Sequence, residues 1–246
     1  MSDLTWLLPL GLFAGALTTL AGLGGGLLLT LALAAVWGPA PALATAAPAL
    51  LVGNVHRVAL YRRHADWRAI APFVLGGVPG ALVGGLLTVS LPETVLRVLL
   101  VGAVAMAFAR QLRLVPGARS GIGPRAPSNA MVVLGMFVAG VITATSGGGG
   151  LLLAPLLLMR GFTNERFVVA ASSVATSIHV ARIAGYGAGG LVTVEVLSHA
   201  AVLAAAILAG NVLGRRGRRW MSERRGVQLT YAVLGASVLL TVLGFR

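Results

Sequence analysis

The sequence contains no cysteine and no lysine, and only 10% of its 246 residues are charged. The absence of cysteine excludes disulfides and thiolate metal sites. Because a soluble domain is about one-quarter charged, a chain with so few charges cannot cover its own surface in water. Acidic residues are the scarcest charges: six Asp and Glu stand against 19 arginines, which gives a net charge of +13.

Most of the chain is apolar, with 57% hydrophobic residues and a mean hydropathy of +0.92. Apolar runs of about 20 residues recur along its whole length, as in helices that span a bilayer. The arginines lie between these runs, which favours a role in membrane topology over nucleic-acid binding. No arginine precedes Arg57, which argues against a secretory signal peptide. The sequence therefore predicts an all-α polytopic membrane protein in a lipid bilayer, without a cofactor, a metal or a nucleic-acid partner.

Two glycine-rich stretches have nearly the same letters, AGLGGG at 21–26 and TSGGGG at 145–150, and three leucines follow each. A similar match relates RVALY at 57–61 to RIAGY at 182–186. Further along each half, GALVG is matched by GNVLG. Because the matches keep their order, we infer an internal duplication.

The duplication predicts two repeats, 1–112 and 130–246, joined by a cytoplasmic linker at 113–129 that is rich in Pro, Gly and Arg. Each repeat begins with a long glycine-interrupted segment, at 5–37 and at 130–160. Three ordinary transmembrane helices are expected to follow in each repeat, at 40–61, 69–89, 93–112, 165–187, 194–213 and 226–245.

The distribution of arginine predicts the orientation of these segments. The arginine-rich loops at 56–68 and 215–225, like the linker, are expected in the cytoplasm. The loops at 37–42, 90–94 and 187–193 contain no arginine and are expected outside. Both termini are then external.

On this assignment each glycine-interrupted segment is a hairpin that begins and ends on one side of the membrane. The first hairpin enters from outside and the second from the cytoplasm, so the two repeats are inverted. Inverted repeats with helices broken at matching positions are typical of secondary transporters, and the breaks point to a substrate site near the midplane.

The glycine runs are the first candidate for an anion site. A new helical arm begins after each run, and its first N–H groups and its dipole attract anions. Glycine lets the backbone approach a ligand closely, and the second run adds two hydroxyl donors. The expected substrate-binding residues are Gly24, Gly25, Gly26, Thr145, Ser146, Gly147, Gly148, Gly149 and Gly150. Tight helix packing is the alternative, and it is the favoured interpretation for the isolated pairs Gly80/Gly84 and Gly210/Gly214.

A polar stripe in SSVATSIHVARIAGY, at 172–186, is the second candidate. Arg182 lies within a predicted span, and its planar guanidinium suits an oxyanion. Snorkelling of this side chain to the external interface is the alternative. Ser173, Thr176 and Ser177 are expected to contribute hydroxyls to the same site.

Two histidines, His56 and His179, could relay protons near neutral pH or form helix–helix hydrogen bonds instead. Arg57, next to His56, lies at a cytoplasmic end, where membrane topology alone explains it. No carboxylate is expected mid-membrane to bind Na⁺ or to carry a proton. All six fall at span ends or in loops: Asp3, Asp66, Glu93, Glu165, Glu195 and Glu223.

In these motifs the chain resembles the TauE/SafE family of sulfite exporters. The resemblance rests on GLGGGLLL at 22–29, SGGGGLLLAPLLL at 146–158, VATS at 174–177 and GNVLG at 210–214. It implies an inner-membrane carrier of small sulfur-containing or organic anions, with Gly147–Gly150, Thr176 and Ser177 matching the family pattern best. The first repeat departs from that pattern, because ALATAAPALL at 42–51 lacks the Thr-Ser pair.

Together these features predict export of a small anion across the inner membrane, such as sulfite, sulfoacetate or a related organosulfur or organic oxyanion. The inside-negative potential assists anion exit by ~2.3 kcal/mol per charge per 100 mV, so export needs no coupled ion. An anion channel or uniporter and a proton-coupled importer stay open as alternatives, and a homodimer is compatible with each. We expect no enzymatic activity, because the membrane segments lack a catalytic carboxylate pair, and a structural subunit would not need two buried glycine breaks.

Overall fold

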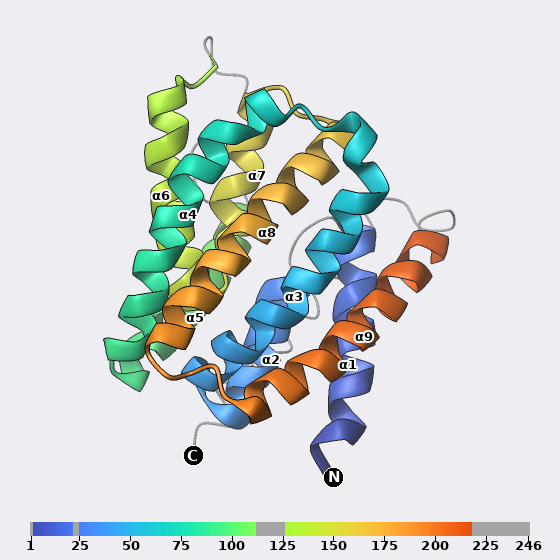
Figure 1. Cartoon of the computed structure of the whole chain (residues 1–246), viewed down its shortest axis with the longest axis vertical. Coiled ribbons are helices and arrows are strands. Elements are labelled where there is room, and N and C mark those ends of the chain that lie inside the picture. Colours follow the sequence, from blue (N-terminus) through green and yellow to red (C-terminus); the bar gives the residue numbers. More distant parts are fainter. Residues whose placement is uncertain (1, 22–24, 112–125, 218–246) are drawn as a thin grey trace.

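The structure is a computed structural model that describes residues 2–21, 25–111 and 126–217. These residues form nine α-helices and one 3-10 turn, and no strand (Figure 1). The α-helices are α1 Ser2–Ala21, α2 Gly25–Trp37, α3 Pro39–Tyr61, α4 Trp67–Ser90, α5 Glu93–Gln111, α6 Asn129–Ser146, α7 Gly150–Met159, α8 Asn164–Ala188 and α9 Val194–Gly217, and the 3-10 turn η1 is Arg62–His64.

Both predicted glycine breaks are confirmed, between α1 and α2 and between α6 and α7. Each broken pair is a hairpin whose ends meet. Trp6 of α1 contacts Trp37 of α2 with ring centroids 5.2 Å apart, and Arg160, just after α7, bonds to Asn129 at the start of α6. The 13 residues of α2 and the 10 of α7 extend about 20 and about 15 Å. Since the hydrocarbon core is about 30 Å thick, neither returning arm can cross it alone.

The remaining described helices lie within a few residues of the predicted spans. Five helices are long and apolar enough to cross a membrane by length and composition, namely α3 with its following turn, α4, α6, α8 and α9. The helix α5 was also predicted to span, but it is not among these five; it carries Glu93 and Arg97 near its start. The predicted span 226–245 and nearly all of the linker lie outside the described residues.

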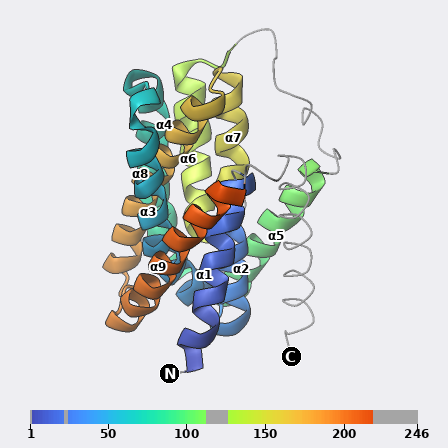
Figure 2. The same ribbon diagram turned by 90° about the vertical axis from the view of Figure 1, so that its right-hand side faces the viewer.

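The helices pack into two bundles that each combine elements from both halves of the sequence. Buried apolar side chains of α1, α2, α3, α5 and α9 form one core, which we call the α1 bundle. Those of α4, α6, α7 and α8 form the other, the α6 bundle. Figure 2 shows α9 lying along α1, with α2 beside it. A small cluster of Leu43, Ala44, Ala47 and Tyr186 joins the two bundles where α3 meets α8.

Glycines allow the closest helix contacts inside each bundle. A Cβ atom on Gly80 or Gly84 of α4 would overlap the backbone of α6. The Cβ on Gly84 would lie 2.7 Å from the Val141 carbonyl oxygen. Cβ atoms on Gly210 and Gly214 of α9 would likewise overlap the backbone of α1. The Cβ on Gly214 would lie 2.6 Å from the Ala16 carbonyl oxygen. The packing interpretation of these two glycine pairs is therefore confirmed.

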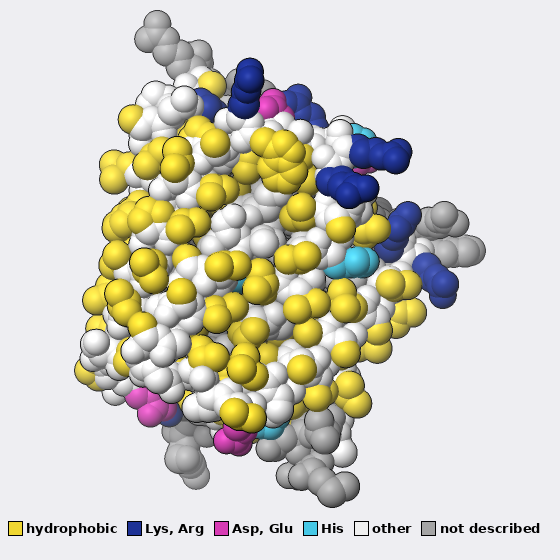
Figure 3. Space-filling model, viewed as in Figure 1, with side chains coloured by type: hydrophobic (Ala, Val, Ile, Leu, Met, Phe, Trp, Pro, Cys, Tyr) yellow, Lys and Arg dark blue, Asp and Glu magenta, His cyan; other side chains and the backbone are white. Residues whose placement is uncertain are grey.

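Charged side chains gather at the two ends of the molecule, and apolar side chains cover the face between them (Figure 3). A group of arginine side chains lies at the upper end and upper right of Figure 3. Arg62 and Arg63 belong to η1, and Arg166 pairs with Asp66 at 3.2 Å. The opposite end carries Glu93, which pairs with Arg97. Of the carboxylates that the structure describes in full, each lies at or next to a helix start, as expected: Asp66, Glu93, Glu165 and Glu195.

Candidate functional site

The turn of the second hairpin is built on a left-handed glycine. Gly147 has φ +72°, and its N–H donates to the Thr143 carbonyl at 2.9 Å, which ends α6. This conformation favours glycine. The hydroxyls of Thr145 and Ser146 donate back into α6, to the carbonyls of Val141 and Ile142 at 3.0 and 2.8 Å. Such back-bonding is common for hydroxyl side chains within helices, so in this conformation their protons are used inside α6. The Ser146 oxygen also accepts a hydrogen bond from the Gly148 N–H at 3.4 Å.

Both hairpins have the same packing where the returning arm begins. Thr143 donates to the Ala139 carbonyl at 2.6 Å, and its hydroxyl lies directly against Gly149. In the first hairpin Thr18 donates to the Ala14 carbonyl at 2.7 Å, and its hydroxyl lies against Gly25. A Cβ at either glycine would overlap the threonine oxygen.

The second glycine turn also reaches the α1 bundle. A Cβ on Gly147 would lie 3.1 Å from the hydroxyl of Thr30 on α2, and one on Gly148 would lie 2.7 Å from Ala103 on α5. Gly150 begins α7, and Gly26 faces Leu50 of α3. Gly24, predicted as part of the site, lies outside the described residues. The glycine turn is thus enclosed by protein, as a backbone break in a membrane requires.

Arg182 is buried in the α3–α8 contact. Only 1% of the residue is exposed, so it does not snorkel to the surface. Its Nη2 donates to the Leu43 carbonyl of α3 at 3.0 Å, and its guanidinium carbon lies 5.4 Å from the centre of the Tyr186 ring. Its Nε is buried without a hydrogen-bond partner. No carboxylate of the described chain lies within ion-pair distance of Arg182.

A single carbonyl connects Arg182 with the glycine turn. The Ala144 oxygen, in the last turn of α6, accepts a hydrogen bond from the Tyr186 hydroxyl. The Thr88 hydroxyl of α4 lies 3.1 Å from the same oxygen and 2.8 Å from the Gly84 carbonyl, so the two carbonyls share its one proton. Carbonyls at a helix C-terminus need partners from outside the helix, and here α4 and α8 supply them. Tyr186, which packs on Arg182, therefore also holds the residue that precedes Thr145.

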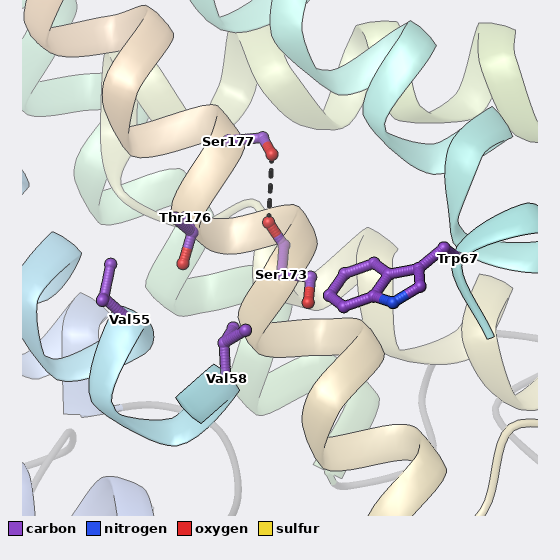
Figure 4. Close-up of a pocket in the computed structure, with 6 residues that line it drawn as sticks. All are labelled: Val55, Val58, Trp67, Ser173, Thr176 and Ser177. Carbon is purple, nitrogen blue, oxygen red and sulfur yellow. Dashed lines mark hydrogen bonds between the residues drawn. The ribbon is translucent and has the colours of Figure 1, made fainter. Parts of the chain in front are cut away.

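The predicted polar stripe of α8 is divided between two faces. His179 and Arg182 point into the core, at 5% and 1% exposure. Ser173, Thr176 and Ser177 instead line an open hollow of about 300 Å³ with Val55 and Val58 of α3 and Trp67 of α4 (Figure 4).

The hydroxyls in this hollow differ in their bonding. Thr176 and Ser177 donate to carbonyls of α8, at 2.8 and 3.1 Å. Ser173 has a buried hydroxyl without a partner. The three residues predicted to share a site with Arg182 thus form a separate surface, of which only Ser173 has an uncommitted hydroxyl.

Two further buried nitrogens belong to the histidines predicted as a proton relay. Nδ1 of His56 and Nδ1 of His179 have no hydrogen-bond partner. Near His56, Asn54 accepts a hydrogen bond from Arg57 Nη2 at 2.7 Å. No group of three or more metal-ligating side chains occurs in the part of the chain that the structure describes.

Comparison with known proteins assigns this arrangement to a family. Residues 7–242 match the family model described as sulfite exporter TauE/SafE. The chain belongs to the TauE/SafE family. It is thus a multi-pass protein of a membrane transporter family, and the resemblance drawn from its glycine motifs is confirmed.

One similar curated protein is named "Probable membrane transporter protein y4hK", from Sinorhizobium fredii (strain NBRC 101917 / NGR234). The present chain is 31% identical to that protein over 116 residues, and the match spans 44% of each of the two chains. No solved structure matches the chain.

The sequence did not predict the contacts around Arg182. Thr88 and Tyr186 meet at Ala144 from positions 56 and 42 residues away, and no local pattern predicts such a contact. The internal duplication does indicate Asn54, together with His56 and Arg57: Asn54 stands three residues before Arg57, as His179 stands three residues before Arg182.

Proposed function

We propose that this TauE/SafE family member exports a small oxyanion, such as sulfite or sulfoacetate, from the cytoplasm across the inner membrane. Buried Arg182, which has no carboxylate partner among the described residues, is the observation that carries the proposal. The arginine-rich end of the molecule faces the cytoplasm, as the positive-inside rule requires. The N-terminal end of α1 is then external.

The isolated charge of Arg182 has a high free-energy cost in the folded protein. A buried cation without a counter-charge is strongly destabilising, and charges inside membrane segments mark substrate pathways. The guanidinium keeps one arm on the Leu43 carbonyl while Nε stays unbonded. An oxyanion supplies the missing negative charge and accepts parallel hydrogen bonds from arginine.

The matched contacts of the two halves support inverted repeats. The Thr18–Gly25 contact of the first hairpin is repeated by Thr143–Gly149 in the second. The packing of α9 on α1 through glycine is repeated by α4 on α6. The hairpins enter from opposite ends of the molecule (Figure 1). Transporters of this design bind substrate between the repeats and expose the site to each side in turn.

The energy for export comes from the membrane potential in this proposal. An anion leaving an inside-negative cell gains ~2.3 kcal/mol per charge per 100 mV. None of the four carboxylates described above lies in the middle of a helix, so these groups provide no mid-membrane site for Na⁺ or a proton.

The test is transport by purified protein in proteoliposomes. Sulfite, sulfate and sulfoacetate fluxes are measured under an imposed potential, with and without a pH gradient. We expect potential-driven flux, reduced about tenfold or more in Arg182→Gln through loss of a charge-assisted bond. Arg166→Gln, which removes an exposed arginine, serves as the control and keeps wild-type flux.

Several outcomes overturn the proposal. Absence of flux for every anion rejects transport of this class, and wild-type flux in Arg182→Gln rejects the site. Uptake driven by the pH gradient, and abolished in His179→Gln, points to the proton-coupled importer. Size-exclusion chromatography of Arg182→Gln in detergent shows whether the variant is folded.

A further inference from the structure

We propose that Arg57 is a second anion-binding station, on the cytoplasmic side of Arg182, and that the anion passes between the two arginines along the α3–α8 contact. This inference rests on the proposed anion transport. It gives a function to a residue that the sequence pattern alone attributes to membrane topology.

The first support is a matched set of side chains on the two contacting helices. On α3, Asn54 precedes Arg57 by three residues and Tyr61 follows it by four; on α8, His179 and Tyr186 take the same places around Arg182. Residues at these spacings lie on one face of a helix. Each arginine thus has a polar neighbour on one side and a tyrosine on the other.

The second support is the environment of Arg57. Its Nη2 donates to Asn54 at 2.7 Å, while its Nε is buried and has no hydrogen-bond partner. Arg57 takes part in neither of the two ion pairs among the described residues, Arg97–Glu93 and Arg166–Asp66. Arg182 shows the same combination of one hydrogen bond to a neutral oxygen and an unpartnered Nε.

Other arginines at the same end of the molecule differ from Arg57. Arg62 and Arg63 on η1 and Arg68 on α4 are exposed, and Arg166 pairs with Asp66. A topological signal needs only exposed charges near the span ends. The buried, unpaired Nε of Arg57 is therefore not explained by topology.

The third support is continuity between the two arginines. His179, one helical turn before Arg182, is buried and its Nδ1 has no hydrogen-bond partner. Nδ1 of His56, next to Arg57, is likewise buried and unpartnered. The open hollow described above is lined on its α3 side by Val55 and Val58, on either side of Arg57 in the sequence. Figure 4 shows these valines facing the α8 hydroxyls across the hollow. An anion entering here meets Ser173 and then the positive charges of the core.

The experiment measures anion affinity from each side of the membrane. Inside-out vesicles from expressing cells present the cytoplasmic face to radiolabelled sulfite, and right-side-out vesicles present the external face. We expect Arg57→Gln to raise the half-saturating concentration at the cytoplasmic face by about tenfold. Arg182→Gln has its larger effect at the external face. The matched control Arg63→Gln removes an exposed charge from the same end and changes the cytoplasmic value by less than about twofold.

A second measurement distinguishes loss of anion binding from misfolding of a variant. Sulfite raises the thermal unfolding midpoint of purified wild-type protein in detergent if it binds the folded state. With two stations, each single variant keeps part of this shift and the double variant Arg57→Gln/Arg182→Gln loses it. Wild-type affinity at the cytoplasmic face in Arg57→Gln, with flux intact, overturns the second station alone. Absence of flux in the wild-type protein overturns the proposed function instead.

Discussion

The guanidinium of Arg182 on α8 donates a hydrogen bond of 3.0 Å to the backbone carbonyl of Leu43 on α3. This bond crosses from the α6 bundle to the α1 bundle, at the contact that Leu43 and Tyr186 also fill with apolar atoms. In the proposed function an anion on the same guanidinium competes for its donors. That proposal therefore couples substrate binding to the contact between the bundles, which is what alternating access between two packed units needs.

The coupling predicts different behaviour for two substitutions of Arg182. Lysine keeps the charge but offers a single ammonium in place of the planar fork. We expect Arg182→Lys to keep measurable flux with a weaker apparent affinity, and Arg182→Gln to lose flux because the charge itself is gone. Sulfite flux in proteoliposomes, measured over a range of concentrations, separates the two effects. Equal loss in both variants would instead indicate that the hydrogen-bond geometry alone matters.

The Ala144 carbonyl predicts a non-additive effect on stability. Tyr186→Phe and Thr88→Val each remove one donor and leave the other in place. The double variant leaves a buried carbonyl without these partners, which costs about 1–3 kcal/mol. We expect the double variant to lose more free energy of unfolding than the two single variants together. Reversible unfolding in detergent gives the three values, and simple additivity would show that Ala144 finds another donor.

Two glycines with positive φ provide a matched test of the glycine turn. Gly147 has φ +72° and Gly161 has φ +79°, but a Cβ on Gly161 meets nothing within 4 Å. Alanine at either position adopts a left-handed backbone, at about 1–2 kcal/mol. Only at Gly147 does it also press on Thr30, at 3.1 Å. We expect both variants to lose thermal stability. Gly147→Ala should also reduce anion flux, whereas Gly161→Ala should keep wild-type flux. Equal flux in both would remove the second glycine turn from the transport site.

These residues show how far the sequence determines the architecture. The glycine breaks were predictable because four adjacent glycines disrupt a helix locally, whatever packs around them. The division of the α8 stripe follows from helical periodicity, because nine residues at about 100° each place Ser173 and Arg182 on opposite sides of α8. The sequence does not show which of the two sides packs into the core and which lines the hollow. Arg57 could be read as a topological signal, since the sequence does not show that its Nε is buried.

The α4–α6 contact predicts a large penalty for a single methyl group. A Cβ on Gly80 would overlap the Phe137 carbonyl oxygen, which is backbone and cannot rotate away. Gly80→Ala must separate the two helices, and overpacking of this kind costs about 1–3 kcal/mol. Gly102 of α5 is the control, because a Cβ there meets nothing within 4 Å. We expect the thermal unfolding midpoint to fall in Gly80→Ala and to stay near wild type in Gly102→Ala.

The absence of cysteine allows the orientation and the hollow to be tested by single cysteines in the natural background. Ser177→Cys places a thiol in the hollow at a half-buried position, and Val194→Cys places one at the opposite end of the molecule, where the residue is 86% exposed. A membrane-impermeant thiol reagent should label Ser177→Cys from the cytoplasmic face and Val194→Cys from outside. Sulfite should slow the labelling of Ser177→Cys, because the proposed entry route passes through the hollow, and leave Val194→Cys unaffected. Labelling of both positions from one face would show that the predicted orientation is wrong, and labelling of Ser177→Cys that is insensitive to sulfite would place the entry route elsewhere.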